Sequence, residues 1–295
     1  DDGESTTMLL RNADLAMYQA KEDGRNTYNY FNPSQQDKMK EKLALESELR
    51  HAVEKRQLYL QYQVIVDNEA KQVLGVEALL RWKSEKFGLV MPDRFIDIAE
   101  QTGLIEPIGE WVIDTACARV KAWQQQGFAD LTLSINVSPR QFRSDRLMRT
   151  IRRNLQQQFP AEQLILEMTE SLLIKNPPQA LQILTELNSM GVKLAMDDFG
   201  TGYSSLSYLK RYPFDSLKID RSFVGDIVDD ADDRALVAAA ISMGKGLGLT
   251  VVAEGVENNQ QLALLKSMNC DMLQGYLFGK PQDPDELLAY LIDNR

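Results

Sequence analysis

Short apolar segments recur at intervals through most of the chain, and their number and spacing limit the possible folds more than any other feature. Eight segments rich in apolar and β-branched residues begin at positions 58, 73, 131, 164, 193, 216, 250 and 272. Helical patterns, such as those at residues 108–127 and 178–191, separate the later segments. This alternation is typical of parallel βα units, and eight such strands close naturally into a barrel. We therefore predict an α/β fold built on a (β/α)8 barrel.

The first connection departs from this pattern. Only residues 67–72 (DNEAKQ) separate the first two predicted strands. A parallel crossover needs about a dozen residues or more, so these two strands should run antiparallel. The expected architecture is a modified TIM barrel with an antiparallel first strand.

The residues ahead of the barrel are too few to form a domain of their own. Residues 8–30 predict an amphipathic helix that ends at Asp23-Gly24, followed by a short strand-like tail. Residues 34–56 predict a second helix, whose apolar face carries Leu45, Leu49, Ala52 and Val53. We interpret this second helix as a linker that docks onto the barrel.

The composition excludes several classes of function. Forty-three acidic and 33 basic residues give a formal net charge of −10, which argues against nonspecific binding to DNA, RNA or an anionic membrane. Cys117, Cys270 and the single His51 are too few for a Cys/His zinc site or a disulfide framework. The longest apolar run, at 235–249, is interrupted by Gly and Lys and is too short to span a bilayer. We expect a cytoplasmic protein without membrane contact of its own, although segments outside this chain could anchor its parent.

Polar side chains interrupt nearly every predicted strand near its C-terminal end, where strands buried on both faces are otherwise apolar. Glu77 and Arg81 stand four residues apart in the second strand and therefore share a face. Comparable positions on the later strands carry Asn136, Glu167, Asp197, Asp198, Lys218, Asp220, Glu254 and Gln274. Because the C-terminal ends of barrel strands meet at one mouth, we expect these groups to converge there.

Each of these residues, taken alone, also has a structural interpretation. Glu77 could pair with Arg81, Asn136 could close a turn, and Asp197 could cap the next helix. Carboxylate or amide groups at the ends of six strands are harder to explain in this way. Burying each of them unpaired would cost on the order of several kcal/mol.

Divalent cations would balance this surplus of acidic groups, because only Arg81 and Lys218 are available as counter-charges. Oxygen donors without His or Cys favour Mg²⁺ or Mn²⁺, whereas Ca²⁺ would bind and distort the geometry. The adjacent Asp197 and Asp198 could each hold one ion of a pair, the arrangement that clamps both oxygens of a phosphoryl displacement. The residues by themselves therefore predict a two-metal phosphoester hydrolase.

Seven motifs follow one another along the barrel region. They are VEALLRW (76–82), SINVSPRQF (134–142), ILEMTE (165–170), DDFGTGYSSL (197–206), LKIDRSFV (217–224), VVAEGVE (251–257) and QGYLFGKP (274–281). In order and spacing across residues 45–290, these motifs resemble those of EAL-domain cyclic di-GMP phosphodiesterases. That family has the same barrel with an antiparallel first strand.

The resemblance implies a role for each candidate residue. It implies metal ligands at Glu77, Asn136, Glu167, Asp197 and Asp198, with Asp220 and Glu254 completing the inner or water-mediated shell. It implies substrate contacts at Arg81 for a phosphate, at Gln63 and Gln274 for the guanine or its surroundings, and at Glu257 for the neighbouring pocket. The implied catalytic group is Lys218, Glu254 and Glu170, in which Lys218 orients or deprotonates the attacking water and Glu170 braces the loop at 197–206.

The resemblance also implies the reaction. Family members cleave one phosphodiester of cyclic di-GMP to give linear pGpG, often as dimers whose interface is linked to the site by the loop at 197–206. We therefore expect two divalent cations, Mg²⁺ or Mn²⁺, inhibition by Ca²⁺, and a homodimer. One alternative is a cyclic di-GMP receptor that binds without cutting, although such receptors typically lack a carboxylate or the lysine. A barrel acting on another phosphodiester is a third possibility.

The sequence departs from the family pattern at two places and also resembles a second family near its N-terminus. Val64 replaces the usual proline after Gln63, and the segment at 83–90 differs from the common pattern; neither change removes a ligand. Residues 9–31 are similar to the last helix and strand of GGDEF diguanylate cyclase domains. The expected domains are a GGDEF remnant at 1–33, a linker helix at 34–56 and an EAL barrel at 57–295.

Overall fold

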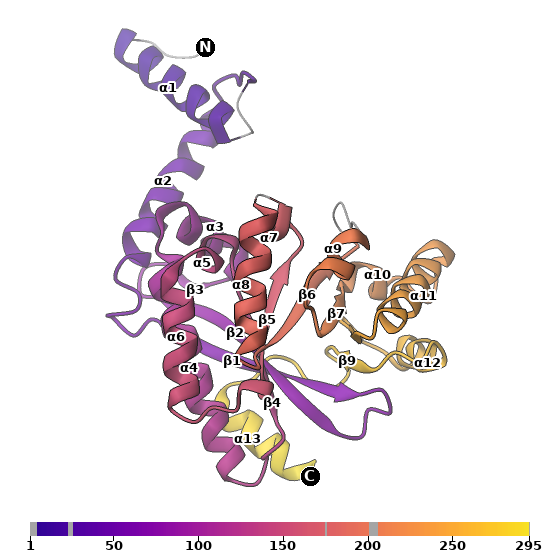
Figure 1. Cartoon of the computed structure of the whole chain (residues 1–295). Helices are drawn as coiled ribbons and strands as arrows, with labels where there is room; N and C mark the ends of the chain where they lie inside the picture. Colours follow the sequence, from indigo (N-terminus) through magenta and orange to yellow (C-terminus); the bar gives the residue numbers. More distant parts are fainter. Residues whose placement is uncertain (1–4, 23–25, 175, 201–205, 295) are drawn as a thin grey trace.

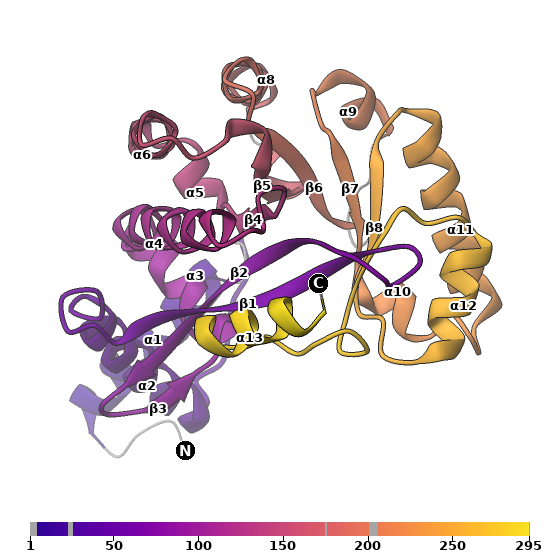
Figure 2. The ribbon, with the colours of Figure 1, turned by 90° about the horizontal axis from the view of Figure 1, so that it is seen from below.

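The computed structural model describes residues 5–22, 26–174, 176–200 and 206–294 of the chain. Eight strands form a closed barrel in the order β1-β9-β8-β7-β6-β5-β4-β2, and β2 pairs back with β1 (Figure 1, Figure 2). The strands are β1 Leu58–Asp67, β2 Val73–Ser84, β4 Thr132–Asn136, β5 Leu164–Thr169, β6 Lys193–Phe199, β7 Ser216–Ile219, β8 Thr250–Ala253 and β9 Met272–Gln274. The predicted barrel and its eight strands are confirmed.

Strand β1 runs antiparallel to both of its barrel neighbours, β2 and β9. All other neighbouring pairs in the barrel are parallel. The turn after β1 is tight because the Asp67 carboxylate accepts hydrogen bonds from the backbone N–H groups of Lys71 (2.7 Å) and Gln72 (2.9 Å). The antiparallel first strand, predicted from the short connection, is therefore confirmed.

The segment at 83–90 forms a hairpin that the sequence patterns did not predict. A short strand, β3 Gly88–Val90, pairs antiparallel with the end of β2. The Ser84 hydroxyl accepts hydrogen bonds from the backbone N–H groups of Lys86 and Phe87, and Gly88 supplies the positive φ of +66° that the turn requires. A strand of three residues is too short to show an alternating pattern.

Helices cover the outside of the barrel. They are α3 Pro92–Thr102, α4 Ile105–Gln125, α5 Pro139–Phe142, α6 Asp145–Gln156, α7 Ser171–Ile174, α8 Pro177–Ser189, α9 Leu206–Arg211, α10 Arg221–Gly225, α11 Ala231–Gly246, α12 Asn259–Ser267 and α13 Pro284–Asp293, with a 3₁₀ turn at Ala161–Gln163. Proline begins α3, α5, α8 and α13, because a missing N–H costs nothing in the first turn. None of the described helices has the length and apolar character needed to cross a membrane.

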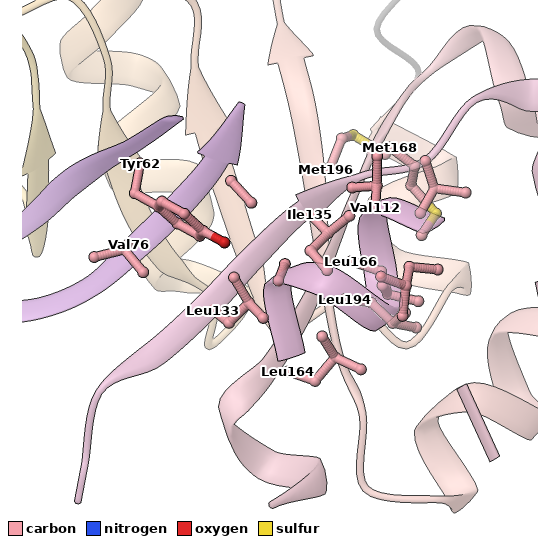
Figure 3. Packing of buried hydrophobic residues seen from close by; sticks show 14 of the residues in the cluster. Tyr62, Val76, Val112, Leu133, Ile135, Leu164, Leu166, Met168, Leu194 and Met196 are labelled. Atoms are coloured by element: carbon pink, nitrogen blue, oxygen red, sulfur yellow. The ribbon is translucent and has the colours of Figure 1, made fainter. Parts of the chain in front are cut away.

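Side-chain alternation along the strands divides residues between the barrel interior and the helical layer. Outward-facing residues pack beneath the helices with Val112 of α4, as Figure 3 shows for Leu133, Ile135, Leu164, Leu166, Leu194 and Met196. On β1, Tyr62 packs edge-on against Trp123 of α4, with ring centroids 5.0 Å apart. The intervening residues face the interior, and they include the predicted polar groups.

Two helices precede the barrel, α1 Thr6–Glu22 and α2 Pro33–Leu49. Helix α1 lies away from the barrel, and α2 leads towards it and packs against α3 (Figure 1). Leu45, Leu49 and Ala52 are buried, which agrees with the predicted docking face, although the helix ends at Leu49. The expected strand-like tail after α1 is wrong for residues 26–32, which form no strand, because none of the described strands of the sheet pairs with them.

Candidate active site

Polar side chains from seven strands meet at one mouth of the barrel, because the carboxyl ends of its parallel strands lie together. They are Glu77 (β2), Asn136 (β4), Glu167 (β5), Asp197 (β6), Lys218 (β7), Glu254 directly after β8, and Gln274 (β9). Register places Asn136 opposite Glu167 on β5, and Gln63 of β1 opposite Glu77. The structure thus brings these side chains into one cluster.

Lys218 lies at the centre of the cluster and is only 2% exposed. Its Nζ lies 2.5 Å from Glu167 Oε2 and 2.5 Å from Glu254 Oε1. It also lies 3.4 Å from Glu77 Oε2 and 3.8 Å from Asp197 Oδ1. One ammonium group therefore faces carboxylates from four different strands or strand ends.

Glu77 accepts hydrogen bonds from two side-chain amides of the cluster. Its Oε1 accepts from Asn136 Nδ2 (2.6 Å), and its Oε2 accepts from Gln274 Nε2 (2.7 Å). Gln274 Nε2 also donates to Gln63 Oε1 (3.2 Å), and Gln63 Nε2 donates to the carbonyl of Gly279 (3.0 Å). The amides of β1, β4 and β9 thus hold the Glu77 carboxylate in place.

Burial and crowding change the pKa values in this cluster in different directions. Burial opposes ionisation of Glu77, but Lys218 and the donors Gln274 and Asn136 outweigh it and lower its pKa. Burial raises the pKa of Glu167 well above its usual range despite Lys218, since Glu77, Asp197 and Glu254 add repulsion. Burial disfavours the Lys218 ammonium, yet the surrounding carboxylates raise its pKa well above the usual range. Lys218 is therefore charged in this arrangement.

The shifted pKa of Glu254 predicts a pH-dependent stability. Burial, with repulsion from Asp197 and Glu77, raises it from 4.5 to about 7 against the attraction of Lys218. An acid with a raised folded-state pKa binds more protons when folded, so its contribution to stability is present at low pH and is lost as pH rises from 4.5 to about 7. We expect the free energy of unfolding in EDTA to fall by on the order of 2–3 kcal/mol across this range. Urea unfolding at several pH values measures it; Glu254→Gln should flatten the profile, and a parental profile that rises would contradict the assignment.

The donor chemistry of the cluster suits hard divalent cations. Four carboxylates surround one ammonium, which leaves a surplus of negative charge. The buried Oε1 of Gln274 has no hydrogen-bond partner in the described part of the chain. Among the described residues, no three Asp, Glu, His or Cys side chains form a group that could hold a metal ion, and Lys218 Nζ lies between the carboxylates. Charge and oxygen donors thus fit Mg²⁺ or Mn²⁺, while the ligand set stays a prediction.

Two of the predicted ligands lie at the edge of the cluster. Asp198 is exposed and lies within an irregularity of β6 between Met196 and Phe199, with a left-handed φ of +54° that aspartate tolerates better than most residues. Burial, together with repulsion from Asp197 and Asp220, raises its pKa. Asp220 caps α10, because its Oδ1 accepts hydrogen bonds from the backbone N–H (3.0 Å) and the hydroxyl (2.5 Å) of Ser222. Within the described residues, Asp197 Oδ1 caps no helix in this way; it accepts a hydrogen bond from the Asp198 N–H (2.9 Å).

Three further predicted site residues are Glu170, Glu257 and Arg81. Glu170 is buried directly after β5, but the loop that it would brace lies partly at 201–205, outside the described residues. Glu257 is exposed after β8, and its backbone N–H donates to Gln261 Oε1. The structural interpretation of Arg81 as the partner of Glu77 is wrong within the described residues: its Nε donates to Gln61 Oε1 (2.9 Å) and its Nη1 to the Leu80 carbonyl (3.0 Å).

Arg81 lines a cavity of about 440 Å³ next to the cluster. Asn136 and Thr169 line it from the barrel, and apolar side chains of α3 and α4, including Ile96 and Val112, line its other wall. A largely apolar cavity with a few polar groups is typical of small-molecule sites. This cavity has the size and the lining to hold part of a nucleotide beside the carboxylates.

A second hollow of about 420 Å³ lies inside the barrel beneath the cluster. It reaches Glu167 and Lys218, and its lining includes the small or polar side chains Ser134, Ala195 and Ser216. Barrel interiors are usually filled by bulky branched residues, so this floor is unusually open. Its polar lining is suited to ordered water.

Two residues near Arg81 were missed by the sequence reasoning. Gln61 contacts Arg81, and its Nε2 donates to Asp283 Oδ1 (3.1 Å) at the start of α13. Gln61 shares a strand face with Gln63, so alternation along β1 was a signal that could have found it. Asp283 had no such signal, because its position before Pro284 is also that of an ordinary helix cap.

Cyclic di-GMP enzymes are among the proteins that are similar to this chain in sequence. A family model described as EAL domain matches residues 46–281. The bifunctional diguanylate cyclase/cyclic di-GMP phosphodiesterase MucR of Pseudomonas aeruginosa is 45% identical over 289 residues, which cover 98% of this chain and 42% of MucR. The cyclic di-GMP phosphodiesterase NbdA of the same species is 42% identical over 282 residues, covering 95% of this chain and 36% of NbdA. The chain thus spans less than half the length of these relatives.

Solved structures of related proteins have the same fold. The PaMucR phosphodiesterase in complex with c-di-GMP is 44% identical, with a TM-score of 0.80 over 83% of this chain and 99% of that one. The EAL enzyme Bd1971 in its cAMP- and cyclic-di-GMP-bound form is 32% identical, with a TM-score of 0.83 over 98% of this chain and 76% of that one. With its closed barrel, its cluster of carboxylates around a buried lysine and these matches, the chain belongs to the EAL-domain family.

Proposed function

We propose that this chain is a phosphodiesterase that hydrolyses cyclic di-GMP to linear pGpG with divalent cations, Mg²⁺ or Mn²⁺. The observation that carries the proposal is the convergence of Glu77, Glu167, Asp197 and Glu254 on Lys218, beside a cavity lined by Arg81. The names of MucR and NbdA and the ligand of the PaMucR complex support this choice of substrate.

The chain's own side chains have distinct tasks in this proposal. Arg81 binds an oxygen of the substrate phosphate through its guanidinium. Divalent cations would be held by Glu77, Asn136, Glu167, Asp197 and Asp198, with Asp220 and Glu254 around them, and would supply Lewis-acid polarisation of that phosphate. Lys218 holds the attacking water as an ammonium group, or accepts its proton where bound cations keep the amine neutral. The water oxygen bonds to phosphorus as one ribose–phosphate bond breaks, and the leaving ribose oxygen takes up a proton.

The decisive experiment is incubation of the purified chain with cyclic di-GMP and Mg²⁺ or Mn²⁺, with the products separated by chromatography. Linear pGpG is expected with either ion, with little product in excess EDTA or with Ca²⁺ alone. Undiminished turnover in EDTA would contradict the metal requirement. Tight binding of cyclic di-GMP without any product would identify a receptor instead, and preference for linear dinucleotides at equal concentration would change the substrate class.

Arg81→Ala is expected to weaken binding of cyclic di-GMP while leaving cation binding unchanged. A charge-assisted hydrogen bond contributes about 1.5–3 kcal/mol, so Kd should rise by roughly 10- to 150-fold. Calorimetry with Ca²⁺ in place of Mg²⁺ measures this Kd without turnover. Arg152→Ala, which removes an exposed arginine paired with Glu186 on the outer helices, is the matched control. Equal Kd values for the two variants would remove Arg81 from the substrate site.

The remaining expectations are proposals of the same kind. We propose that the chain forms a homodimer, that residues 1–33 belong to a GGDEF domain, that 34–56 link it to the barrel at 57–295, and that the protein acts in the cytoplasm. The match to the bifunctional MucR covers 98% of this chain and so extends beyond the EAL match at 46–281, which supports the assignment of residues 1–33 to a GGDEF domain. Light scattering of the purified chain tests the proposed homodimer.

A further inference from the structure

We propose that Gln61 is a positioning residue for Arg81: its side-chain amide connects the guanidinium to Asp283 and so fixes the direction in which Arg81 meets the substrate phosphate. This inference rests on the proposed function, because it concerns how that substrate is held. Neither the seven motifs nor the implied ligand set includes Gln61 or Asp283.

The contacts form a continuous chain of three side chains. Arg81 Nε donates to Gln61 Oε1 at 2.9 Å, and Gln61 Nε2 donates to Asp283 Oδ1 at 3.1 Å. Both distances are normal for N–H···O hydrogen bonds. The three residues come from β2, β1 and the residue before α13, so the relay forms only when the barrel closes.

The polarity of this relay allows only one arrangement of the amide. A guanidinium can only donate hydrogen bonds, and an ionised carboxylate can only accept them. Gln61 must therefore point its oxygen at Arg81 and its NH₂ group at Asp283, which is the arrangement observed. A residue without both a donor and an acceptor at this position could not join the two.

Strand register explains why Gln61 reaches Arg81. On β1 and β2, Gln61 stands opposite Leu79, and Arg81 stands opposite Tyr59. Gln61 and Arg81 are thus diagonal neighbours on one face, a separation that long side chains can bridge. The same face carries Gln63 and Glu77, so the relay lies in line with the carboxylate cluster.

The segment that carries Asp283 is held firmly against β1. Tyr62 and Gln282 exchange two backbone hydrogen bonds (2.8 and 2.9 Å), and Gln63 Nε2 donates to the Gly279 carbonyl. Figure 2 shows α13 lying along β1. The Asp283 side chain makes no capping hydrogen bond to α13, which leaves its carboxylate to accept from Gln61.

The relay limits the freedom of the guanidinium. The hydrogen bonds from Nε to Gln61 and from Nη1 to the Leu80 carbonyl fix the plane of the Arg81 guanidinium. Within the described residues, Nη2 makes no hydrogen bond. Arg81 is then preorganised for a phosphate, which lowers the entropy cost of binding. Such an interaction acts alike in the ground and transition states, so its loss should raise KM and leave kcat nearly unchanged.

The test compares Gln61→Met with the parental chain, since methionine is similar in size and lacks both hydrogen bonds. We expect KM for cyclic di-GMP and its Kd with Ca²⁺ to rise by roughly tenfold, with kcat within about twofold. Gln72→Met, at an exposed site just before β2, is the matched control and should behave as the parent. Asp283→Asn keeps an acceptor for Gln61 and should stay close to parental, whereas Asp283→Ala should shift KM in the direction of Gln61→Met.

A double-mutant cycle separates positioning from a merely structural role. If Gln61 acts through Arg81, Gln61→Met should not weaken binding any further when Arg81 is already alanine. An equal loss in both backgrounds would overturn the inference, as would an unchanged KM in the single variant. If the parental chain itself neither binds nor hydrolyses cyclic di-GMP, the proposed function fails; if the parent does both and only the Gln61 series is flat, this inference alone fails.

Discussion

Replacing Lys218 with methionine is expected to lower turnover of cyclic di-GMP by roughly 10²- to 10⁴-fold, because the side chain holds the attacking water or takes its proton. The same change should destabilise the cation-free protein by about 3–5 kcal/mol, since it leaves buried carboxylates without their counter-charge. The largest loss of charge compensation is expected at Glu167 and Glu254, because each has a carboxylate oxygen 2.5 Å from Lys218 Nζ. Binding of the substrate should change much less than the rate.

Two measurements test this expectation. Single-turnover rates across a pH series report the catalytic role, and urea unfolding in EDTA reports the loss of charge balance. Mg²⁺ or Mn²⁺ should restore much of the lost stability, because a bound cation replaces the missing positive charge. Lys193→Met is the matched control: Lys193 also pairs with an aspartate, Asp215, but is 44% exposed and should cost no more than about 1 kcal/mol. A parental rate at every pH would make Lys218 a counter-charge only.

The second large effect is expected from Glu77→Gln, which removes one negative charge but little volume. Turnover should fall by more than about 100-fold, since even groups that only support a metal ligand cost about 10- to 100-fold when removed. Glu77 is 6% exposed and accepts hydrogen bonds from Asn136, Gln274 and Lys218, so no neighbouring carboxylate can replace it in this geometry. Asp197→Asn should have the same effect for the same reason.

Thermal unfolding with Mn²⁺ tests the role of Glu77 as a cation ligand without an activity assay. Addition of Mn²⁺ should raise the melting temperature of the parental chain, because ligands that bind only the folded state stabilise it. Glu77→Gln should lose most of that shift, whereas Glu186→Gln, a surface carboxylate paired with Arg152, should keep it. A full Mn²⁺-induced shift in Glu77→Gln would show that Glu77 is not part of the cation site.

The sequence by itself determined the barrel fold and most of the polar residues at the C-terminal ends of its strands. Strand patterns are local, so eight apolar segments and their turns were visible without any long-range contact. The connection at 67–72 was too short for a crossover, which required an antiparallel pair. The strands are otherwise apolar, so Glu77, Glu167 and Lys218 stood out in them, because charged side chains are rarely buried unless they are paired.

Tertiary structure alone decided how these residues meet. Lys218 lies between four carboxylates because the closed barrel aims β2, β5, β6 and the end of β8 at one point, a fact of register and tilt that no local pattern records. Gln61 and Asp283 stand 222 residues apart, and they touch only because β9 and the segment before α13 return to β1. Strand and helix periods are set by neighbouring residues, whereas side-chain contacts across a barrel depend on its closure.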